Sequence, residues 1–291
     1  MTARAERESL VAEAERVIRE GSTSFRFASR LFDQKTRERA WLLYAWCRAC
    51  DDLTDGQVLG HNAAPPADSS ERVALARALT DRALAGEMTR NRAFDALALV
   101  VEECAIPRRF IDDHLAGFAL DAAGWRPETQ EDLLRYCYHV AGAVGCMMAV
   151  IMGVAPDDEE TLRHAADLGT AFQLANIARD IVEDDSVGRI YIPATWLAEK
   201  GILSGALGAP CHRADLADYA RRLAALAAPY EASARVGAER LPRRSRWAVL
   251  SAANIYGDIA RKVIARGERA WDSRTVISKW AKLAHVARAL R

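Results

Sequence analysis

Four aspartates in two pairs carry the most informative chemistry in this chain, because each pair is spaced for one face of a helix. Asp51 and Asp55 form the first pair, and Asp180 and Asp184 form the second. Carboxylates four residues apart lie one above the other and repel each other, so a partly buried cluster must be protonated or hold cations. Oxygen ligands alone suit a hard divalent ion such as Mg²⁺, with Mn²⁺ as a substitute, that bridges to substrate phosphates.

Each pair ends a helical run in which further polar residues fall in the same phase. At about 100° per residue, the first run stays within roughly 40° of its first member and the second within about 60°. The two runs therefore present nearly the same polar stripe twice. The stripes consist of Tyr44, Arg48, Asp51 and Asp55, and of Gln173, Asn176, Asp180 and Asp184.

A buried network of Arg–Asp salt bridges would explain one such stripe without any ligand. The run before Arg48 is apolar, and a buried arginine beside two aspartates is costly unless they serve each other or a ligand. Because the arrangement occurs twice, we favour a metal site. A di-iron centre would need Glu-x-x-His motifs, and the sequence has none. His114 and His139 are interpreted as helix residues with ordinary hydrogen bonds.

Between the stripes, a helical pattern carries Gly142 and Gly145. Glycine inside a helix reduces stability, so both glycines indicate close packing against another backbone or a ligand. The face predicted for this run is apolar with one hydroxyl at its end, which fits either plain core packing or the wall of a long hydrocarbon site. At about 100° per residue, its members fall within about 60°, and they are Tyr136, Val140, Ala143 and Met147.

Two shorter segments are placed to complete a site. Residues 21–25 (GSTSF) supply hydroxyls and amides before a helix, a pattern typical of a helix cap and also able to contact an anion. Gly188 and Pro193 are expected to end the second aspartate helix and turn the chain back. That turn would leave Arg189 near the aspartates.

The elements that must position these residues are helices almost throughout, because the apolar period is helical and no run alternates like a strand. The two aspartate pairs lie on opposite sides of a loop-like stretch, 56–70, and a second such stretch covers 201–212. Splitting the chain at the first would divide the site, so we expect one all-α domain, 1–291. The predicted helices cover 5–20, 24–32, 35–55, 69–85, 89–104, 107–122, 128–154, 157–186, 213–240, 243–267 and 273–290.

Composition excludes several classes of protein. The 291 residues carry 40 basic and 40 acidic side chains, which argues against nucleic-acid binding driven by bulk charge. The charged N-terminal segment lacks the apolar region of a secretory signal. The longest uncharged apolar stretch, 140–155, is shorter than the roughly 20 residues of a membrane span. It predicts a buried central helix.

The six cysteines are expected to be reduced core residues. Cys47 and Cys50 form a C-x-x-C, but no second pair follows at zinc spacing and no βαβ pattern surrounds it. We therefore interpret them as two small residues three apart on a helix.

Four motifs together resemble the squalene/phytoene synthase family of head-to-head prenyl transferases over most of the chain. They are G-S-x-S-F at 21–25, Y-A-W-C-R-x-x-D-D-x-x-D at 44–55, Y-C-Y-x-V-A-G-x-V-G at 136–145 and Q-L-x-N-I-x-R-D-I-x-E-D at 173–184. Segments 241–249 and 274–279 are similar to the bacterial phytoene synthase branch. The resemblance implies an all-α isoprenoid synthase fold, a bundle of helices around a central cavity.

The resemblance also implies roles for individual residues. Mg²⁺ would be anchored on the substrate diphosphates by Asp51, Asp55, Asn176, Asp180 and Asp184. Contacts to the diphosphate or the reacting centre are implied for Tyr44, Arg48, Gln173, Arg179 and Tyr256, and substrate contacts for Ser22, Ser24, Phe25 and Arg189. Tyr136 would lie beside the carbocation, and the prenyl channel would be lined by Val140, Val144 and Gly145. Many relatives carry Lys where this chain has Thr23, so that charged phosphate contact is missing or supplied elsewhere.

The activity implied is the Mg²⁺-dependent condensation of two geranylgeranyl diphosphates, through a cyclopropyl diphosphate, to phytoene in carotenoid biosynthesis. The alternative is squalene or hydroxysqualene synthesis from farnesyl diphosphate, whose squalene ending takes hydride from NADPH. The sequence has no G-x-G-x-x-G between strand and helix, and the branch resemblance points the same way, so no NADPH is expected.

A family-like assembly factor without catalysis is the remaining alternative. Its aspartates would be eroded, and all four are present here. For an enzyme, the resemblance implies a cytoplasmic protein that contacts the inner membrane surface and the downstream carotenoid enzymes, because its substrates are apolar.

Overall fold

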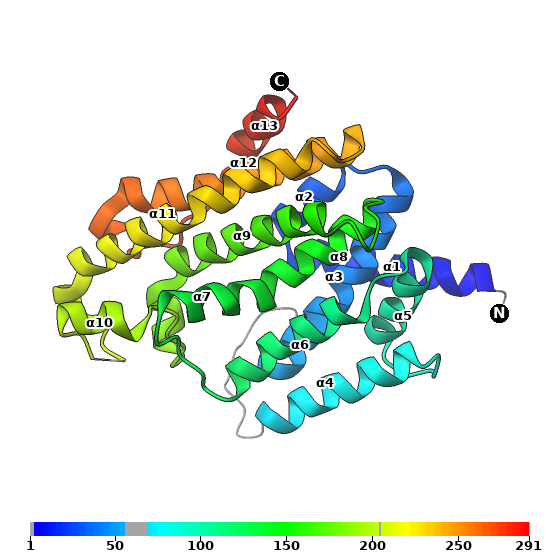
Figure 1. The fold of residues 1–291 in the computed structure, drawn as a ribbon, viewed down its shortest axis with the longest axis horizontal. Coiled ribbons are helices and arrows are strands. Elements are labelled where there is room, and N and C mark those ends of the chain that lie inside the picture. Colours follow the sequence, from blue (N-terminus) through cyan, green and yellow to red (C-terminus); the bar gives the residue numbers. More distant parts are fainter. Residues whose placement is uncertain (1–2, 56–68, 204, 291) are drawn as a thin grey trace.

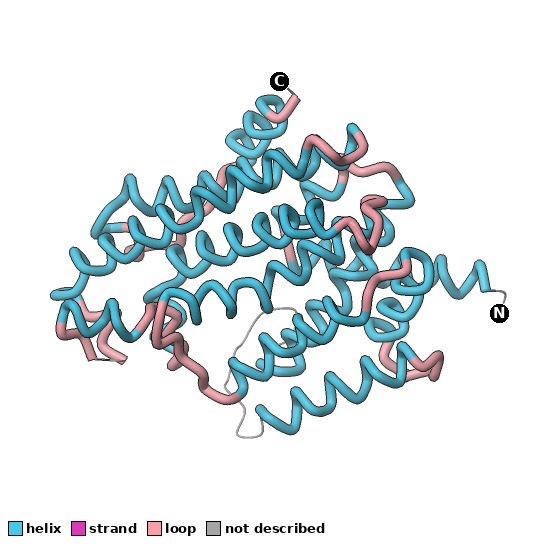
Figure 2. Tube along the Cα trace, in the orientation of Figure 1, coloured by secondary structure: helices cyan, strands magenta, loops and turns pink. Residues whose placement is uncertain are grey.

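The computed structural model describes residues 3–55, 69–203 and 205–290, without the side chains of Ala3, Thr23, Ser24 and Asp55. Within these ranges the chain is helical with no β-strand (Figure 2), which confirms the predicted all-α class. The predicted loop 56–70 lies mostly outside the described residues. The α-helices are α1 (Ala3–Gly21), α2 (Thr23–Ser29), α3 (Gln34–Asp55), α4 (Ser69–Leu84), α5 (Arg92–Cys104), α6 (Arg108–Ala122), α7 (Gln130–Cys137), α8 (Ala143–Ile151), α9 (Glu159–Ser186), α10 (Ala194–Lys200), α11 (Arg213–Ala238), α12 (Arg243–Arg266) and α13 (Lys279–Arg288).

Helix α9 runs through the middle of the molecule (Figure 1). Helix α11 packs along α9, α12 packs on both, and α8 packs on α9 as well. A helix covered on several sides needs apolar residues around most of its circumference, which explains why small and apolar residues recur through α9 without a single stripe. The polar residues in the middle of α9 therefore face either another helix or a cavity.

Two apolar clusters form most of the described core. One centres on Leu42, Trp46 and Phe94 and joins α1, α3, α4, α5, α6, α8 and the start of α9. The other centres on Leu174 and Tyr219 and joins α7, the rest of α9, α10, α11 and the end of α12. Helix α3 thus packs in the first cluster, and the part of α9 that carries the second aspartate pair follows residues packed in the second cluster.

The predicted continuous helix 128–154 is interrupted by a π-helical turn, η1 (Tyr138–Gly142), between α7 and α8. A π turn holds an extra residue and shifts the phase of everything after it. The face predicted to carry Ala143 and Met147 is therefore wrong, because both are fully buried and Met147 packs in the first apolar cluster. Residues one position further along the chain, Val144 and Met148, take that place.

The glycines of this region allow two helices to touch. A Cβ atom on Gly145 would lie under 3.0 Å from the carbonyl oxygen of Ala165 on α9, and one on Gly169 would clash with the Ala141 carbonyl group. The predicted close packing of Gly142 and Gly145 on another backbone is confirmed. The stretch Gln130–Ile151 is long and apolar enough to span a membrane by composition, but half of it is buried inside the bundle.

Other differences lie toward the C-terminus. Helix α10 was not predicted, and the last helix begins at Lys279 rather than 273, since Ser278 caps it by accepting a hydrogen bond from Ala281 N at 3.2 Å. The preceding residues 274–278, three of them β-branched, are not helical. All six cysteines carry free thiols; Cys211 is exposed, so its placement in the core was wrong, because the turn before α11 lies on the surface.

Candidate active site

A cavity of about 660 Å³ lies between the helices, within the size range of small-molecule sites. Its lining comes from α2, α3, α6, α7, η1, α8, α9, α11, α12 and the segment after α9. Along α9 the lining extends from Thr161 to Asp184, which is ~35 Å at 1.5 Å per residue. The cavity is therefore long, as a site for an extended chain must be.

The two ends of the cavity differ in chemistry. Arginines, carboxylates and amides from the last part of α3 and the last part of α9 gather at one end. The other end is apolar, and its lining includes Phe32, Ala40, Met148, Met152, Leu241, Ala248 and Val249. The arrangement suits a molecule with an anionic head and a hydrocarbon tail.

Every predicted site residue whose side chain the structure describes lines this one cavity. The side chains of Ser24 and Asp55 lie outside the described part of the chain. The structure brings the residues together, while their catalytic roles stay predictions. The residues are Ser22, Phe25, Tyr44, Arg48, Asp51, Tyr136, Val140, Val144, Gly145, Gln173, Asn176, Arg179, Asp180, Asp184, Arg189 and Tyr256.

The α3 wall of the cavity consists of Tyr44, Arg48 and Asp51. Arg48 Nη1 donates to Asp51 Oδ2 at 2.5 Å and lies 3.8 Å from Asp52 Oδ1. The Tyr44 hydroxyl and Arg48 Nε are buried and make no hydrogen bond at good geometry within the described residues. Because buried polar atoms are normally satisfied, these two atoms are available to a ligand.

The α9 wall consists of Gln173, Asn176, Arg179, Asp180 and Asp184. Arg179 holds Asp180 with two hydrogen bonds, one of them from Nε to Oδ1 at 2.7 Å. Arg274, from the segment after α12, donates to Asp180 Oδ2 at 3.3 Å and to Glu183 Oε1 at 3.0 Å. Sequence reasoning missed Arg274 as a contact of this wall, because only the fold brings that segment to α9.

Asp184 is in a less favourable environment than Asp180. Burial, and then the negative charge of Asp180, raise the pKa of the Asp184 carboxyl to about 8, while Arg189 opposes the shift. As predicted from Gly188, which has φ +80°, the chain turns back after α9. Arg189 N then donates to the Asp184 carbonyl oxygen at 2.9 Å. A cation beside Asp184 would relieve this repulsion.

A second, partly buried carboxylate, Asp121 on α6, was not predicted. It accepts hydrogen bonds from the Tyr136 hydroxyl at 2.9 Å and the Tyr191 hydroxyl at 3.0 Å. The Tyr136 ring stacks with the rings of Trp125 and Tyr191, whose centroids are 5.4 and 4.9 Å away. Burial and Asp121 hold the pKa of Tyr136 well above its ordinary value, so the phenol stays neutral and fixed. The sequence offered one signal for Asp121, because it lies seven residues after His114 and therefore on the same face of a helix.

His114 also lines the cavity. Its Nδ1 lies 3.3 Å from the His139 carbonyl oxygen, and His139 Nδ1 lies 3.0 Å from the Asp113 carbonyl oxygen. The predicted ordinary hydrogen bonds of both histidines are confirmed. Burial lowers the pKa of His114 to about 4, so its ring is neutral near pH 7.

Ser22 serves as the N-cap of α2, and its Oγ accepts from Phe25 N at 3.2 Å. The capping interpretation of residues 21–25 is therefore confirmed for Ser22, which lines the cavity as well.

The polar end offers an oxygen donor set for a divalent cation. Asp51, Asn176, Asp180 and Asp184 present carboxylate and amide oxygens to the cavity, and the raised pKa of Asp184 reflects its burial and then the negative charge of Asp180. Within the described residues, no three His, Cys, Asp or Glu side chains form a metal-holding group by themselves. Mg²⁺ is commonly bound by one or two carboxylates plus substrate phosphates, so the residues present fit such an ion.

The fold places the molecule among isoprenoid synthases. It is similar to the crystal structure of a dehydrosqualene synthase in complex with ligand, with a TM-score of 0.86 and 25% sequence identity over 98% of this chain and 97% of that chain. The expected isoprenoid synthase fold is thus confirmed.

The sequence comparisons identify the family to which the chain belongs within this fold class. The model of the family described as squalene/phytoene synthase matches residues 18–281. The chain is 49% identical to the 15-cis-phytoene synthase of Enterobacter agglomerans over 266 residues, which cover 91% of this chain and 89% of the relative. It is 46% identical to the 15-cis-phytoene synthase of Pantoea ananas over 268 residues, 91% of this chain and 86% of that one. The chain belongs to the squalene/phytoene synthase family.

Proposed function

We propose that this protein catalyses the head-to-head condensation of two geranylgeranyl diphosphates to phytoene, as a single catalytic domain. The observation that carries the proposal is the cavity, whose two aspartate-bearing walls meet at one end while the other end is long and apolar. Relatives named 15-cis-phytoene synthase, at 46 and 49% identity across nine-tenths of the chain, support this choice of substrate and product.

At the polar end, the chain's own residues bind and orient the diphosphates. The guanidinium groups of Arg48, Arg179 and Arg189 line the cavity and match phosphate oxygens in charge and geometry. We propose that Mg²⁺ is held by Asp51, Asp55, Asn176, Asp180 and Asp184. When bound, the ion supplies positive charge that neutralises the diphosphate leaving group.

Nearer the middle of the cavity, Tyr136 is placed to face positive charge. Loss of diphosphate from the first donor leaves an allylic cation, which the double bond of the second donor attacks to form a cyclopropyl diphosphate. Loss of the second diphosphate, rearrangement and release of one proton give phytoene. The electron-rich ring of Tyr136, fixed by Asp121 and by stacking on Tyr191, stabilises cations without reacting with them. The apolar lining excludes water that would quench them.

The alternative is condensation of farnesyl diphosphate, favoured by the similarity in fold to a dehydrosqualene synthase. The higher identity to phytoene synthases argues for the longer substrate. The inner membrane surface and downstream carotenoid enzymes are proposed partners of a cytoplasmic enzyme, since the product is an apolar hydrocarbon.

A product assay tests the proposal. Purified protein with Mg²⁺ and geranylgeranyl diphosphate, without NADPH, is expected to release pyrophosphate and a C40 hydrocarbon identified by mass spectrometry. Asp180→Asn serves as the inactive control. Turnover of farnesyl diphosphate without turnover of geranylgeranyl diphosphate would refute the assignment.

A further inference from the structure

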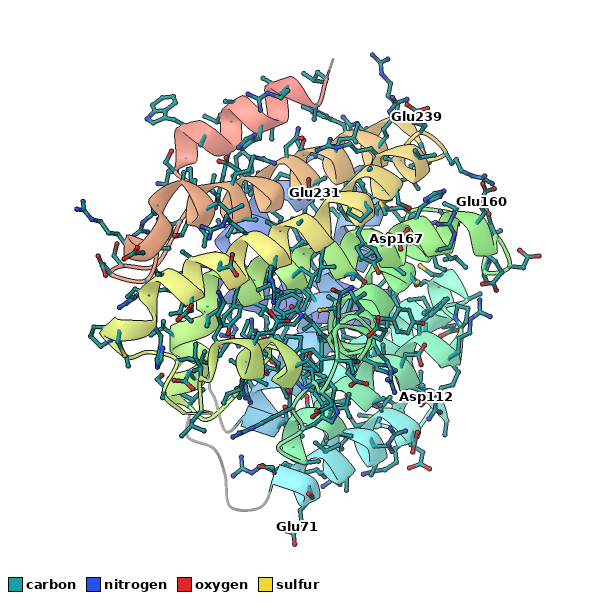
Figure 3. All side chains as sticks on the ribbon, turned by 60° about the vertical axis from the view of Figure 1, so that its left-hand side comes forward. Glu71, Asp112, Glu160, Asp167, Glu231 and Glu239 are labelled. Atoms are coloured by element: carbon teal, nitrogen blue, oxygen red, sulfur yellow. The ribbon has the colours of Figure 1, made fainter. Side chains whose placement is uncertain are left out.

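Helix α13 lies on the outside of α12, at the edge of the molecule (Figure 1), with side chains projecting away from the bundle (Figure 3). Half of the ten exposed large hydrophobic residues in the described chain lie at or after Ile264. Trp280 is 81% exposed, and Val276 and Leu290 near the two ends of α13 are also exposed. Four of these ten residues thus lie within 276–290, in and beside α13.

The exposed apolar residues of α13 form a stripe. At about 100° per residue they fall within a sector of about 100°. A helix on a globular protein normally turns such a stripe toward the core, and α13 does the opposite. We call this surface the outer stripe, and it consists of Trp280, Leu283, Ala284 and Ala287.

Polar contacts on the inner face fix α13 in this orientation. His285 Nε2 lies 3.1 Å from Asp258 Oδ2 on α12, and Trp247 Nε1 donates to the Val286 carbonyl oxygen at 2.9 Å. Asn254 Nδ2 donates to the His285 carbonyl oxygen at 3.3 Å. Rolling the helix to bury Trp280 would break all three contacts, so the outer stripe is a stable feature of the fold.

The charge around the outer stripe is positive. Lys279 and Arg288 flank it on opposite sides at the helical angles given above. Residues 273–291 contain five basic and no acidic residues, in a chain whose total charge is balanced. An apolar stripe with a tryptophan, bordered by basic residues, is typical of a helix that lies in a membrane interface and favours anionic lipid.

A second copy of the chain is a poorer occupant. Stable protein dimers bury roughly 1,200–2,000 Å² in total, and one face of a ten-residue helix supplies only a small part of that area. A lipid surface needs no such area from a single face.

The inner side of α13 connects this surface to the cavity. Ile277 and Ala281 pack with Ile255 and Tyr256 of α12, and both of those residues line the cavity. The outer stripe is therefore separated from the cavity by α13 itself and by α12. We propose that the outer stripe, with Lys279 and Arg288, docks the protein on an anionic bilayer surface.

Vesicle flotation tests the proposal without any catalysis. Phosphatidylcholine vesicles with about 30% phosphatidylglycerol are expected to float the wild-type protein, and pure phosphatidylcholine vesicles to float much less, because each basic residue adds attraction to anionic lipid. Trp280→Ser with Leu283→Ser should lower the partition coefficient by roughly tenfold or more. Lys279→Gln should lower it by about fivefold, and high salt should have the same effect.

Matched substitutions elsewhere are the controls. Leu203 is as exposed as Trp280, at 79%, and Leu203→Ser should leave flotation unchanged, as should Lys35→Gln on α3. Helical circular dichroism should be the same for all variants. Wild-type protein that does not float, flotation that survives the double substitution, or a dimer that the double substitution dissociates would each overturn the proposal.

Pyrophosphate release from detergent-dispersed substrate separates this proposal from the proposed function. The docking variants should retain that activity, since α13 contributes no residue to the cavity lining.

Discussion

The α3 wall and the α9 wall carry similar stripes of polar groups that end in aspartates, but the two walls differ in environment. On the α3 wall, the Asp51 side chain is 39% exposed and pairs with Arg48 of its own helix. On the α9 wall, the Asp180 side chain is 14% exposed and is held by Arg179 and by Arg274 from a distant segment. The α9 wall also contains Asp184, whose charge is disfavoured.

This difference in environment shows that two similar motifs can have different roles within one site. The α3 wall is closer to water, where charges are screened and a ligand meets little resistance. The α9 wall is fixed by arginines and carries unbalanced negative charge at low dielectric, where electrostatic interactions are strongest. We infer that the α9 wall contributes more of the charge stabilisation, and the α3 wall more of the initial binding.

The largest expected effect comes from neutralising one aspartate of each wall. Asp180→Asn should lower kcat by roughly 10³-fold, and Asp51→Asn by roughly 10²-fold, because preorganised charge in a drier site is worth more. Initial rates of pyrophosphate release at saturating Mg²⁺ measure both. A greater loss from Asp51→Asn than from Asp180→Asn would reverse the ranking of the two walls.

The next effect concerns Asp121, which lies close enough to the α9 wall to act on the charge of Asp184. Asp121→Asn should reduce kcat by roughly 10- to 100-fold, because the amide keeps only one acceptor oxygen for the hydroxyls of Tyr136 and Tyr191, which now donate hydrogen bonds to two carboxylate oxygens. Tyr136→Phe, which keeps the ring, should lose less. Equal or greater loss from Tyr136→Phe would mean that the hydroxyl, rather than the ring, does the work.

A smaller effect is expected in the thermal stability of the protein, and it comes from Asp184. The folded-state pKa of Asp184 is raised from 3.8 to about 8, so the folded protein binds a proton that the unfolded chain releases. The contribution of this group is therefore greatest below about pH 4 and is lost as pH rises toward 8. In EDTA at pH 7, Asp184→Asn should raise Tm by at least about 2–4 °C, the shift that roughly 1 kcal/mol produces in a domain of this size.

Thermal melts measured from pH 4 to 8 should show that the Tm of the wild type falls relative to the Tm of Asp184→Asn. Asp51→Asn is the matched change on the α3 wall, and its Tm should change with pH as the Tm of the wild type does. If the Tm values of the wild type and of Asp184→Asn changed in parallel with pH, the inferred difference in electrostatics between the two walls would be contradicted.

Much of this site could be predicted from local sequence. Helical phase placed Arg48 with Asp51 and Asn176 with Asp180, and Gly145 indicated the contact between α8 and α9, because each of these depends only on neighbours along the helix. The phase of Ala143 and Met147 failed because a π turn is not visible in apolar periodicity.

Other features depended on tertiary structure. Arg274 reaches Asp180 from 94 residues away, and Asp121 meets Tyr136 only after α6 packs beside α7 and η1. Helix α10 was missed because it is short, and the outward-facing stripe of Trp280 was missed because a periodic pattern does not say which face meets the core.

The central claim is that the two walls form one binding site for diphosphate and its cation. Isothermal titration of pyrophosphate in the presence of Mg²⁺ tests this directly with the wild type, Asp51→Asn, Asp180→Asn and the double variant. We expect each single substitution to weaken binding by about tenfold or more and the double variant to bind little more weakly than the weaker single variant, because the two groups act on one ligand. Losses that multiply independently in the double variant would contradict a shared site.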